Sequence, residues 1–431
     1  MPEDYQSLAL KYTTIAISQW LTFTIVDTFL VLYLLEFLTY RELGIVIAIQ
    51  LLVGGILDYP TGAFADKFGH GKILFTAYIC IIPGGLILIF QRTFYGVIFA
   101  FTLIAIGRSQ ESGALDSYFD NQYNLGSSNF DKENQLFGAF KSRVQTVNYL
   151  VAGIAFISGG LVATWIGRRF LIFLHVVFSG ITLFLVVKLI GLHKPESDDE
   201  EPMNVFSHAL SGLRFMFSKS SITLFFIGVS LVFAANGAIW YSQLLFPYYY
   251  GYSGSDFMTG VLRSVNFILG TMMVLLVPKM SKKIVNERFW FIVALTYANT
   301  FFFLLTYMYY ILVPPTQTFI LSSFIGVIAL FFMIGFGDVL TSILLNRIQL
   351  EIVPNKIRNS IYSLFTSLIT LLGVPMAILG GWIVTQLGFD YGILSAFLLS
   401  GIGIILASIG AYYLDLGKYG SEKLPTKSES I

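Results

Sequence analysis

The sequence predicts an all-α integral membrane protein with twelve transmembrane helices arranged as two six-helix bundles. Three observations support this fold class. The chain of 431 residues is 56% hydrophobic and only 12% charged, whereas soluble domains carry roughly 25% charged residues. Twelve apolar stretches are long enough to cross a bilayer. The last two apolar stretches of the first half also resemble the last two of the second half in sequence.

Each predicted span contains about 20 or more residues, the length that a ~30 Å hydrocarbon core requires. None of them shows strand-like alternation, which excludes an outer-membrane barrel. The spans cover residues 15–38, 43–65, 72–90, 94–120, 139–164, 170–192, 220–246, 256–279, 289–312, 318–345, 361–386 and 390–415.

Lysine and arginine residues are distributed unevenly between the two sides of these spans. If the N-terminus is inside, most of them fall in inner loops and tails. By the positive-inside rule we expect a multi-pass protein of the cell (cytoplasmic) membrane with both termini in the cytoplasm. The outer loops then hold only Arg41, Arg92, Arg168 and Arg169.

An internal repeat relates the two halves. The segments "SGGLVATWIGRRFLIFLHVVFSG" (158–180) and "LGGWIVTQLGFDYGILSAFLLSG" (379–401) align without gaps at an offset of 221 residues. They share a Gly-Gly pair, and Thr164 matches Thr385. A half-chain offset predicts a parallel repeat with a site near the midplane between the bundles. Chance agreement between apolar helices rich in Gly, Leu and Ile is the alternative.

The repeat and the loops predict a domain organisation. We expect an N-terminal bundle (1–192), a cytoplasmic linker (193–219), a C-terminal bundle (220–415) and a cytoplasmic tail (416–431). The linker begins as an acidic segment and then becomes amphipathic, which predicts a helix on the inner membrane surface. A plain interdomain tether is the alternative. The apolar positions at helical spacing are Val205, Phe206, Ala209, Leu210, Leu213 and Phe217.

Several function classes are excluded by the sequence. A net charge of +1 provides no basic field for nucleic acid, and the single cysteine, Cys80, allows no intrachain disulfide or cysteine metal cluster. The fragment "GHGK" (69–72) lacks the earlier glycine of a P-loop, and Ile73 replaces its Ser/Thr. Neither HExxH nor Gly-x-Ser-x-Gly occurs. We therefore expect no enzyme activity, no metal and no cofactor.

Charged residues inside spans are costly and are by default candidates for function. Arg108 and Glu111, three residues apart on one helix, can neutralise each other locally. Asp58 is either protonatable or bonded to a neighbouring helix. Arg263 requires a counter-charge or an anionic substrate group. The remaining candidates for the coupling site or substrate cavity are Asp27, Asn236, Asn266 and Asp338.

A family resemblance rests on four segments. "GAFADKFGHGK" (62–72) resembles the G-x-x-x-D-R-x-G-R-K loop between helices two and three of the major facilitator superfamily, and "DYPTG" (58–62) resembles its drug-exporter-like prokaryotic members. "SGALDSYFDN" (112–121) and "NRIQLEIVPNKIRNSIYSL" (346–364) resemble further segments of those members. With the twelve spans and the repeat, the resemblance extends over nearly the whole chain.

The resemblance implies a conformational gating loop, in which Asp66 latches the inner ends of helices in the outward-facing state. Two departures reduce the likeness to exporters. His70-Gly71 replaces the usual Arg-Lys, and "AGIAFISGG" (152–160) lacks the proline of the antiporter motif. The gating residues would be Gly62, Asp66, Lys67, Gly69 and Lys72.

The resemblance also implies roles for acids and bases in the first and fourth spans. Drug and proton antiporters often carry an acid in the first helix, so Asp27 would bind a cationic substrate or a proton; a helix-packing role is the alternative. Arg108 matches the arginine of the helix-four motif, and Glu111 beside it would bind and release a proton. A static ion pair is the alternative for these two residues.

The predicted function is secondary active transport of a small molecule by alternating access, with proton-coupled export of amphipathic or drug-like compounds as the leading hypothesis. The alternatives are proton-coupled or facilitative uptake of a metabolite, and a non-transporting membrane receptor with the same fold. The expected partners are a small-molecule substrate, a coupling proton and the lipid bilayer, without nucleic acid. We expect a monomer.

Overall fold

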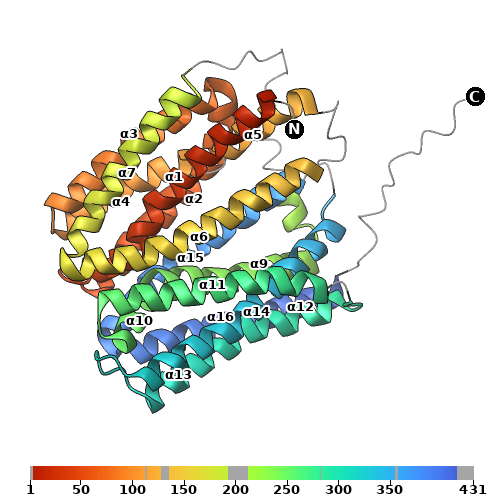
Figure 1. Ribbon diagram of the computed structural model, residues 1–431. Helices are drawn as coiled ribbons and strands as arrows, with labels where there is room; N and C mark the ends of the chain where they lie inside the picture. Colours follow the sequence, from red (N-terminus) through yellow and green to blue (C-terminus); the bar gives the residue numbers. More distant parts are fainter. Residues whose placement is uncertain are drawn as a thin grey trace, which may run out of the picture.

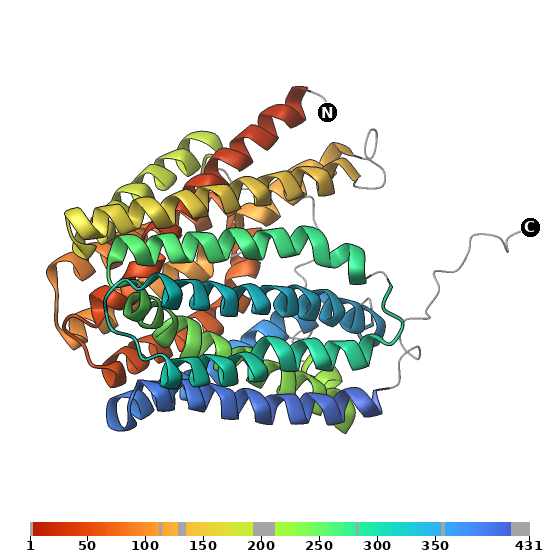
Figure 2. The same ribbon diagram turned by 60° about the horizontal axis from the view of Figure 1, so that its bottom comes forward.

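The structure, a computed structural model, describes residues 3–111, 114–127, 135–192, 212–281, 283–354 and 358–414. All regular elements in these ranges are helices, most of them long and running along one common direction (Figures 1 and 2). The N-terminal half contains α1 (Glu3–Leu34), α2 (Tyr40–Phe68), α3 (His70–Phe90), α4 (Phe94–Glu111), α5 (Ala114–Ser127), α6 (Gln135–Trp165) and α7 (Arg168–Leu189).

The second half is also helical and includes two π-helical segments, η1 and η2. Its elements are α9 (Ser220–Ala235), η1 (Asn236–Leu244), α10 (Leu245–Ser253), α11 (Asp256–Ser281), α12 (Glu287–Leu295), η2 (Thr296–Phe301), α13 (Phe302–Leu312), α14 (Leu321–Ile352), α15 (Arg358–Leu387) and α16 (Phe389–Tyr413).

Eleven helical runs within the described residues are long and apolar enough to cross a membrane. The predicted fourth span corresponds to α4 and α5, on either side of residues 112 and 113, which lie outside the described part. Polar residues at the end of α4 lower its hydropathy, and α5 extends the helical region to Ser127. The all-helical architecture agrees with the predicted fold class.

The start of α1 and the end of α16 lie at one side of the molecule, which we call the terminal side (Figure 2). The opposite side, here called the far side, carries the links between α1 and α2 (residues 35–39) and between α13 and α14 (residues 313–320). Residues 193–211 of the predicted linker lie outside the described part, whereas residues 212–216 are helical. The whole of the predicted tail, 416–431, is likewise outside it.

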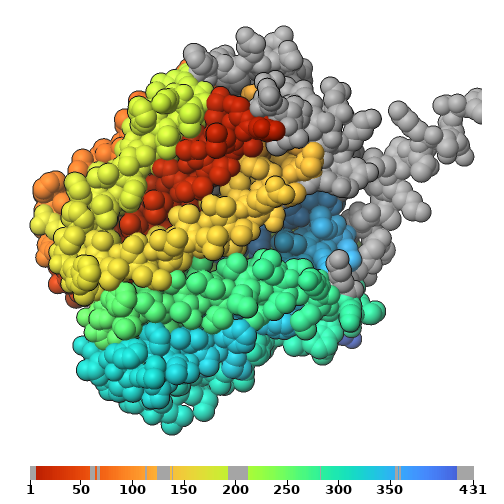
Figure 3. Space-filling model, viewed as in Figure 1, coloured from red at the N-terminus to blue at the C-terminus, as the bar shows by residue number. Residues whose placement is uncertain are grey.

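The helices pack in a pattern that repeats between the two halves. Helix α1 packs against α6 and α7, and its counterpart α9 packs against α15 and α16. The halves meet where α2 packs against α15 and where α6 packs against α11. Figures 1 and 3 show α6 and α11 side by side. Because α2 corresponds to α11 and α6 to α15, these two contacts are equivalent under a two-fold exchange of the halves.

Glycine residues set how closely the halves approach. A Cβ atom added to Gly260 of α11 would lie 3.3 Å from the Cα of Gly160 in α6. One added to Gly44 of α2 would lie 3.2 Å from the Cα of Gly381 in α15. Gly160 and Gly381 are the matched second glycines of the sequence repeat, so the shared Gly-Gly pair is located where backbones of opposite halves touch.

The matched threonines of the repeat act at the same two contacts. The backbone N–H of Phe257, at the start of α11, donates to Thr164 Oγ1 at 2.9 Å. The backbone N–H of Arg41, at the start of α2, donates to Thr385 Oγ1 at 2.8 Å. First-turn N–H groups have no acceptor inside their own helix. Each half therefore supplies an acceptor for a helix start in the other half.

A second glycine contact holds α9 against α16 inside the C-terminal half. A Cβ added to Gly228 would lie 2.6 Å from the carbonyl oxygen of Gly403 and 2.8 Å from the Cα of Ala407. By contrast, a Cβ added to Gly401, on the same helix α16, would meet no atom within 4 Å. The two glycines of α16 therefore differ in packing although they are two residues apart.

We predict opposite effects for alanine at these positions. Gly228→Ala should lower the free energy of unfolding by about 1–3 kcal/mol because the methyl group has no space. Gly401→Ala should be neutral or stabilise by up to about 1 kcal/mol, since alanine has the higher helix propensity. Thermal unfolding of both variants in one detergent measures this difference. Equal melting temperatures would contradict the close α9–α16 contact.

Candidate functional site

A large cavity of about 880 Å³ lies between the halves, mostly within the N-terminal half. Along α1 its wall extends from Tyr12 to Asp27, and along α6 from Lys141 to Phe156. In Figure 3, α6 and α11 are in contact toward the far side and separate toward the terminal side, where blue residues of the C-terminal half are visible between them. The cavity thus extends from the terminal side to the middle of the helices.

A smaller cavity of about 230 Å³ lies within the C-terminal half. Arg263 and Phe267 of α11 line both cavities and so mark where the two are adjacent. Of the eight predicted coupling or cavity residues, seven line one of the two walls. The large cavity receives Asp27, Arg108, Glu111 and Arg263, and the small one receives Arg263, Asn236, Asn266 and Asp338.

Asp27 presents its carboxylate to the large cavity. The residue is exposed there, and it forms no hydrogen bond or ion pair with any residue that the structure describes. Phe23, one helical turn before it on α1, lines the same wall. A charged carboxylate inside a membrane protein is costly unless it is paired or neutralised. Asp27 is therefore available to a proton or to a cationic group that enters the cavity.

Arg108 and Glu111 do not form the ion pair that their spacing suggested. The guanidinium carbon of Arg108 lies 3.9 Å from the centre of the Phe23 ring, a cation–π contact. Glu111 instead accepts a hydrogen bond of 2.5 Å from the hydroxyl of Tyr78 in α3. Both residues line the cavity. Arg108 thus contacts an aromatic ring and Glu111 bonds to a tyrosine, in place of the expected salt bridge between the two residues.

Arg263 is surrounded by aromatic rings from both halves. Its guanidinium carbon lies 5.2 Å from the ring centre of Phe156, 5.5 Å from that of Phe246 and 5.8 Å from that of Phe267. Its buried Nε atom has no hydrogen-bond acceptor among the described residues. A guanidinium in this setting keeps donors available for an anionic group.

Polar residues of the small cavity are held by neighbouring helices. Asn236, the first residue of η1, donates to Asn299 Oδ1 of η2 at 3.0 Å, which joins the two π-helical segments. Asn266 donates to the hydroxyl of Tyr249 at 3.1 Å. The carboxylate of Asp338 makes no hydrogen bond or ion pair within the described part of the chain. The small cavity thus also contains an acid that has no partner among the described residues.

Asp58 differs from the other candidates because it lines neither cavity. It is an exposed residue on α2. The predicted gating loop is shorter than its motif suggests, since α2 continues through "DYPTGAFADKF" and only Gly69, with φ of 98°, separates it from α3. Lys72 is exposed in the first turn of α3. The surroundings of Gly62 and the side chains of Asp66 and Lys67 lie outside the described part.

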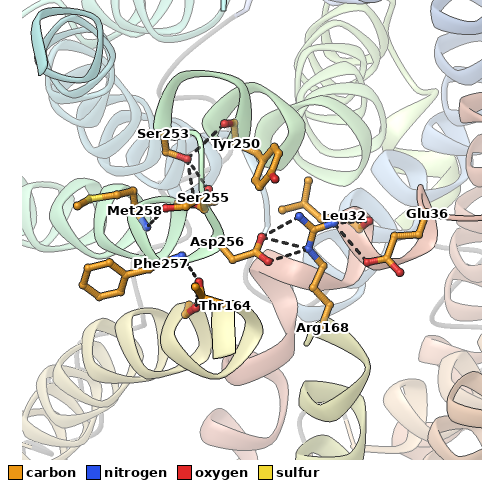
Figure 4. Close-up of polar contacts among 12 residues, drawn as sticks. Leu32, Glu36, Thr164, Arg168, Tyr250, Ser253, Ser255, Asp256, Phe257 and Met258 are labelled. Carbon is orange, nitrogen blue, oxygen red and sulfur yellow. Dashed lines mark hydrogen bonds and ion pairs between the residues drawn. The ribbon is translucent and has the colours of Figure 1, made fainter. Parts of the chain in front are cut away.

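At the far side, a charged network that sequence reasoning missed joins the two halves (Figure 4). Arg168, at the start of α7, makes three hydrogen bonds to the carboxylate of Asp256 at the start of α11. Its Nε donates to both oxygens at 3.1 Å, and its Nη2 donates to Oδ1 at 2.8 Å. Arg168 also donates to the Leu32 carbonyl and lies 3.4 Å from Glu36 of the N-terminal half. Its side chain is 15% exposed and that of Asp256 is 12% exposed.

The sequence carried a signal for this closure. Arg168 follows the repeat glycine, Gly167, and Asp256 precedes Phe257, whose N–H bonds to Thr164. The threonine matched by the repeat therefore marked the contact, although its partner could not be identified from a single sequence.

An ion-pair cluster lies at the terminal end of the large cavity. Lys141 Nζ is 2.5 Å from Asp116 Oδ1 and 3.1 Å from Asp120 Oδ1. The hydroxyl of Tyr12 also donates to Asp116 at 2.6 Å. Both aspartates thus have a cationic partner, in contrast to Asp27 deeper in the cavity.

Comparisons with known proteins agree with this architecture. A family profile described as Major Facilitator Superfamily matches residues 12–375. A comparison with curated protein sequences gives no match. Among solved structures, the nucleoside transporter NupG has a TM-score of 0.73 with 14% identity, covering 95% of this chain and 100% of that chain. A mutant of NupG has a TM-score of 0.73 with 15% identity, covering 94% and 100%.

A further similar structure is a POT family transporter in complex with 5-aminolevulinic acid, with a TM-score of 0.67, 13% identity and coverage of 94% of this chain and 95% of that chain. At these identities the solved structures show a common fold of two six-helix bundles. The profile match extends over most of the sequence, from the first span to the eleventh. The chain therefore belongs to the Major Facilitator Superfamily.

Proposed function

We propose that the protein is a proton-coupled secondary active transporter that exports an amphipathic small molecule. The single observation that carries this proposal is the cavity between the bundles, in which the unpaired carboxylate of Asp27 faces aromatic side chains. Family membership makes the chain a multi-pass membrane transporter of a small molecule and not an enzyme. Coupling and direction belong to the proposal.

Alternating access is supported by the unequal packing of the two sides. On the far side, the two glycine contacts, the two threonine bonds and the Arg168–Asp256 pair bring the halves together. Toward the terminal side, the large cavity separates them. With both termini in the cytoplasm, as the lysine and arginine distribution predicts, this conformation faces inward. The loop of Gly62, Asp66, Lys67, Gly69 and Lys72 would then latch the opposite, outward-facing conformation.

Proton coupling is supported by acids without counter-ions. Asp27 and Asp338 each face a cavity without a partner among the described residues. Glu111 accepts a hydrogen bond from the neutral hydroxyl of Tyr78 and makes no salt bridge with a described residue. A charged carboxylate inside a membrane is costly unless a counter-charge or a proton neutralises it. A proton that neutralises one of them in one conformation and leaves in the other would link the gradient to transport.

Export of an amphipathic compound is supported by Trp20, Phe23 and Phe156 in the wall beside the acid. Uptake of a metabolite is the second candidate, because the same wall holds acids and arginines suited to a polar compound. We further propose that the protein acts as a monomer in the cytoplasmic membrane, since the two bundles of one chain together line the large cavity.

Proton flux tests this function directly. Purified protein in liposomes loaded with a pH dye should show compound-dependent proton movement with a panel of lipophilic cations, neutral drugs, sugars and organic acids. Asp27→Asn and Glu111→Gln should each reduce that flux at least tenfold, since neither side chain can then release a proton. Asp390→Asn, in the first turn of α16 and outside both cavities, is the matched control.

Silence of the folded wild type across the whole panel would argue for uniport or for a receptor without transport. Flux that persists in both variants would remove Asp27 and Glu111 from the coupling mechanism.

The far-side contacts predict a shift in the conformational equilibrium. Arg168→Gln removes charge-assisted bonds that are worth about 2 kcal/mol, so the population open on the far side should rise about 30-fold. Thr164→Val and Thr385→Val should shift it in the same direction by less. Spin labels introduced by Tyr95→Cys and Leu312→Cys in a Cys80→Ser background report the distance across the far side. An unchanged distance distribution in Arg168→Gln would contradict this role.

A further inference from the structure

The large cavity contains charged groups of both signs that do not pair with one another. Asp27 has no hydrogen-bond or ion-pair partner among the described residues. Arg263 keeps a buried Nε without an acceptor, and its guanidinium faces three phenyl rings. Arg108 lies on the Phe23 ring and is three residues from Glu111 on α4. Arg108 and Glu111 lie together on α4, and Asp338 faces the small cavity, so Asp27 and Arg263 are the oppositely charged residues that line the large cavity from different halves.

Asp27 and Arg263 belong to opposite halves. Asp27 is on α1 of the N-terminal half, and Arg263 is on α11 of the C-terminal half. Both line the same cavity. Neither residue takes part in a salt bridge within the described part of the chain, although either charge alone is costly inside the membrane. The protein therefore holds a cation and an anion apart across the space between its bundles.

Helix packing places the two groups at neighbouring depths. A Cβ on Gly159 of α6 would lie 3.0 Å from the carbonyl oxygen of Ile25, two residues before Asp27. One turn and more away on α6, Ser264, next to Arg263, donates to the carbonyl of Gly153 at 3.0 Å. Six residues of α-helix separate these α6 levels, so the backbones of Asp27 and Arg263 differ in depth by about 10 Å.

The side chains reduce this separation. Helical side chains lean toward the N-terminus of their own helix. Asp27 therefore leans toward the terminal side, and Arg263, on a helix of opposite direction, leans toward the far side. The ring of Phe156 lies beside the Arg263 guanidinium and lines the wall between the two levels. One compact molecule can thus reach both charges while its apolar part contacts that ring.

We propose that the substrate is zwitterionic, with a cationic group bound by Asp27 and a carboxylate or similar anionic group bound by Arg263. This inference rests on the proposed transport function and names the substrate class of that cavity. A substrate with one charge would leave the other protein group unpaired. A substrate with both charges pairs each group and connects the two bundles, so its binding favours closure of the cavity.

Matched probes test the charge requirement on the full chain. Phenylalanine, phenethylamine and 3-phenylpropanoate share one skeleton, as do tryptophan, tryptamine and indole-3-propanoate. Binding is measured as ligand-dependent thermal stabilisation of the purified protein without a gradient. In the wild type, the zwitterion of at least one set should bind at least tenfold tighter than its amine and its acid.

Variants should then change which probe is preferred. Asp27→Asn should lose the preference for the zwitterion over the acid, and Arg263→Gln should lose the preference over the amine. Arg263→Lys keeps the charge and should retain the zwitterion preference, which guards against a fold defect in Arg263→Gln. Arg288→Gln is the matched control, because Arg288 lies in the first turn of α12, outside both cavities, where it donates to the Ala411 carbonyl at the end of α16.

The outcomes separate this inference from the proposed function. Equal or tighter binding of the amine or the acid, or failure of both zwitterions to bind, would overturn the zwitterion assignment. The proton flux of the broader compound panel is read independently, so transport of a singly charged or neutral compound would leave the transporter proposal intact and reject only the charge inference. Absence of all compound-dependent flux would reject the transporter proposal.

Discussion

The close approach of backbones at two glycine pairs is the constraint on which the rest of this structure depends. Gly160 against Gly260 and Gly44 against Gly381 bring opposite halves together without side chains between them. At that distance the helix starts of α2 and α11 reach hydroxyl acceptors in the other half, and Arg168 reaches Asp256. Because the far side is closed in this way, the space between the bundles is at the other side.

Aromatic side chains have a second role in the cavity besides filling space. Phe23 lies against Arg108, and Phe156 and Phe267 lie against Arg263. A phenyl ring stabilises a guanidinium through its quadrupole while leaving the N–H edge unused. These rings therefore allow a membrane protein to keep cations available for a ligand, which a carboxylate partner would occupy.

Much of the fold was predictable because apolar length and glycine spacing are properties of the sequence alone. The predicted spans correspond to helices, and the Gly-Gly and threonine matches of the repeat mark the contacts between halves. The candidate site was predictable in composition and less so in pairing. The spacing of Arg108 and Glu111 indicated an ion pair, yet tertiary neighbours Phe23 and Tyr78 take those positions. The side on which Asp58 faces depends on helix rotation, which one sequence does not determine.

The two π-helical segments change how the wall of the small cavity is built. In η1 the backbone N–H of Leu245 donates to the carbonyl of Trp240, five residues earlier, which is the bonding pattern of a π-helix. A π-helical turn contains one residue more than an α-helical turn. Relative to a continuous α-helix, this extra residue shifts the helix that follows by about 1.5 Å along the axis and rotates it by about 100°. Trp240 and Tyr241 owe their place in the wall to this register. The π-helical hydrogen bonds of the backbone thus determine which side chains line that cavity. On a continuous α-helix, the same sequence would place different side chains in the wall.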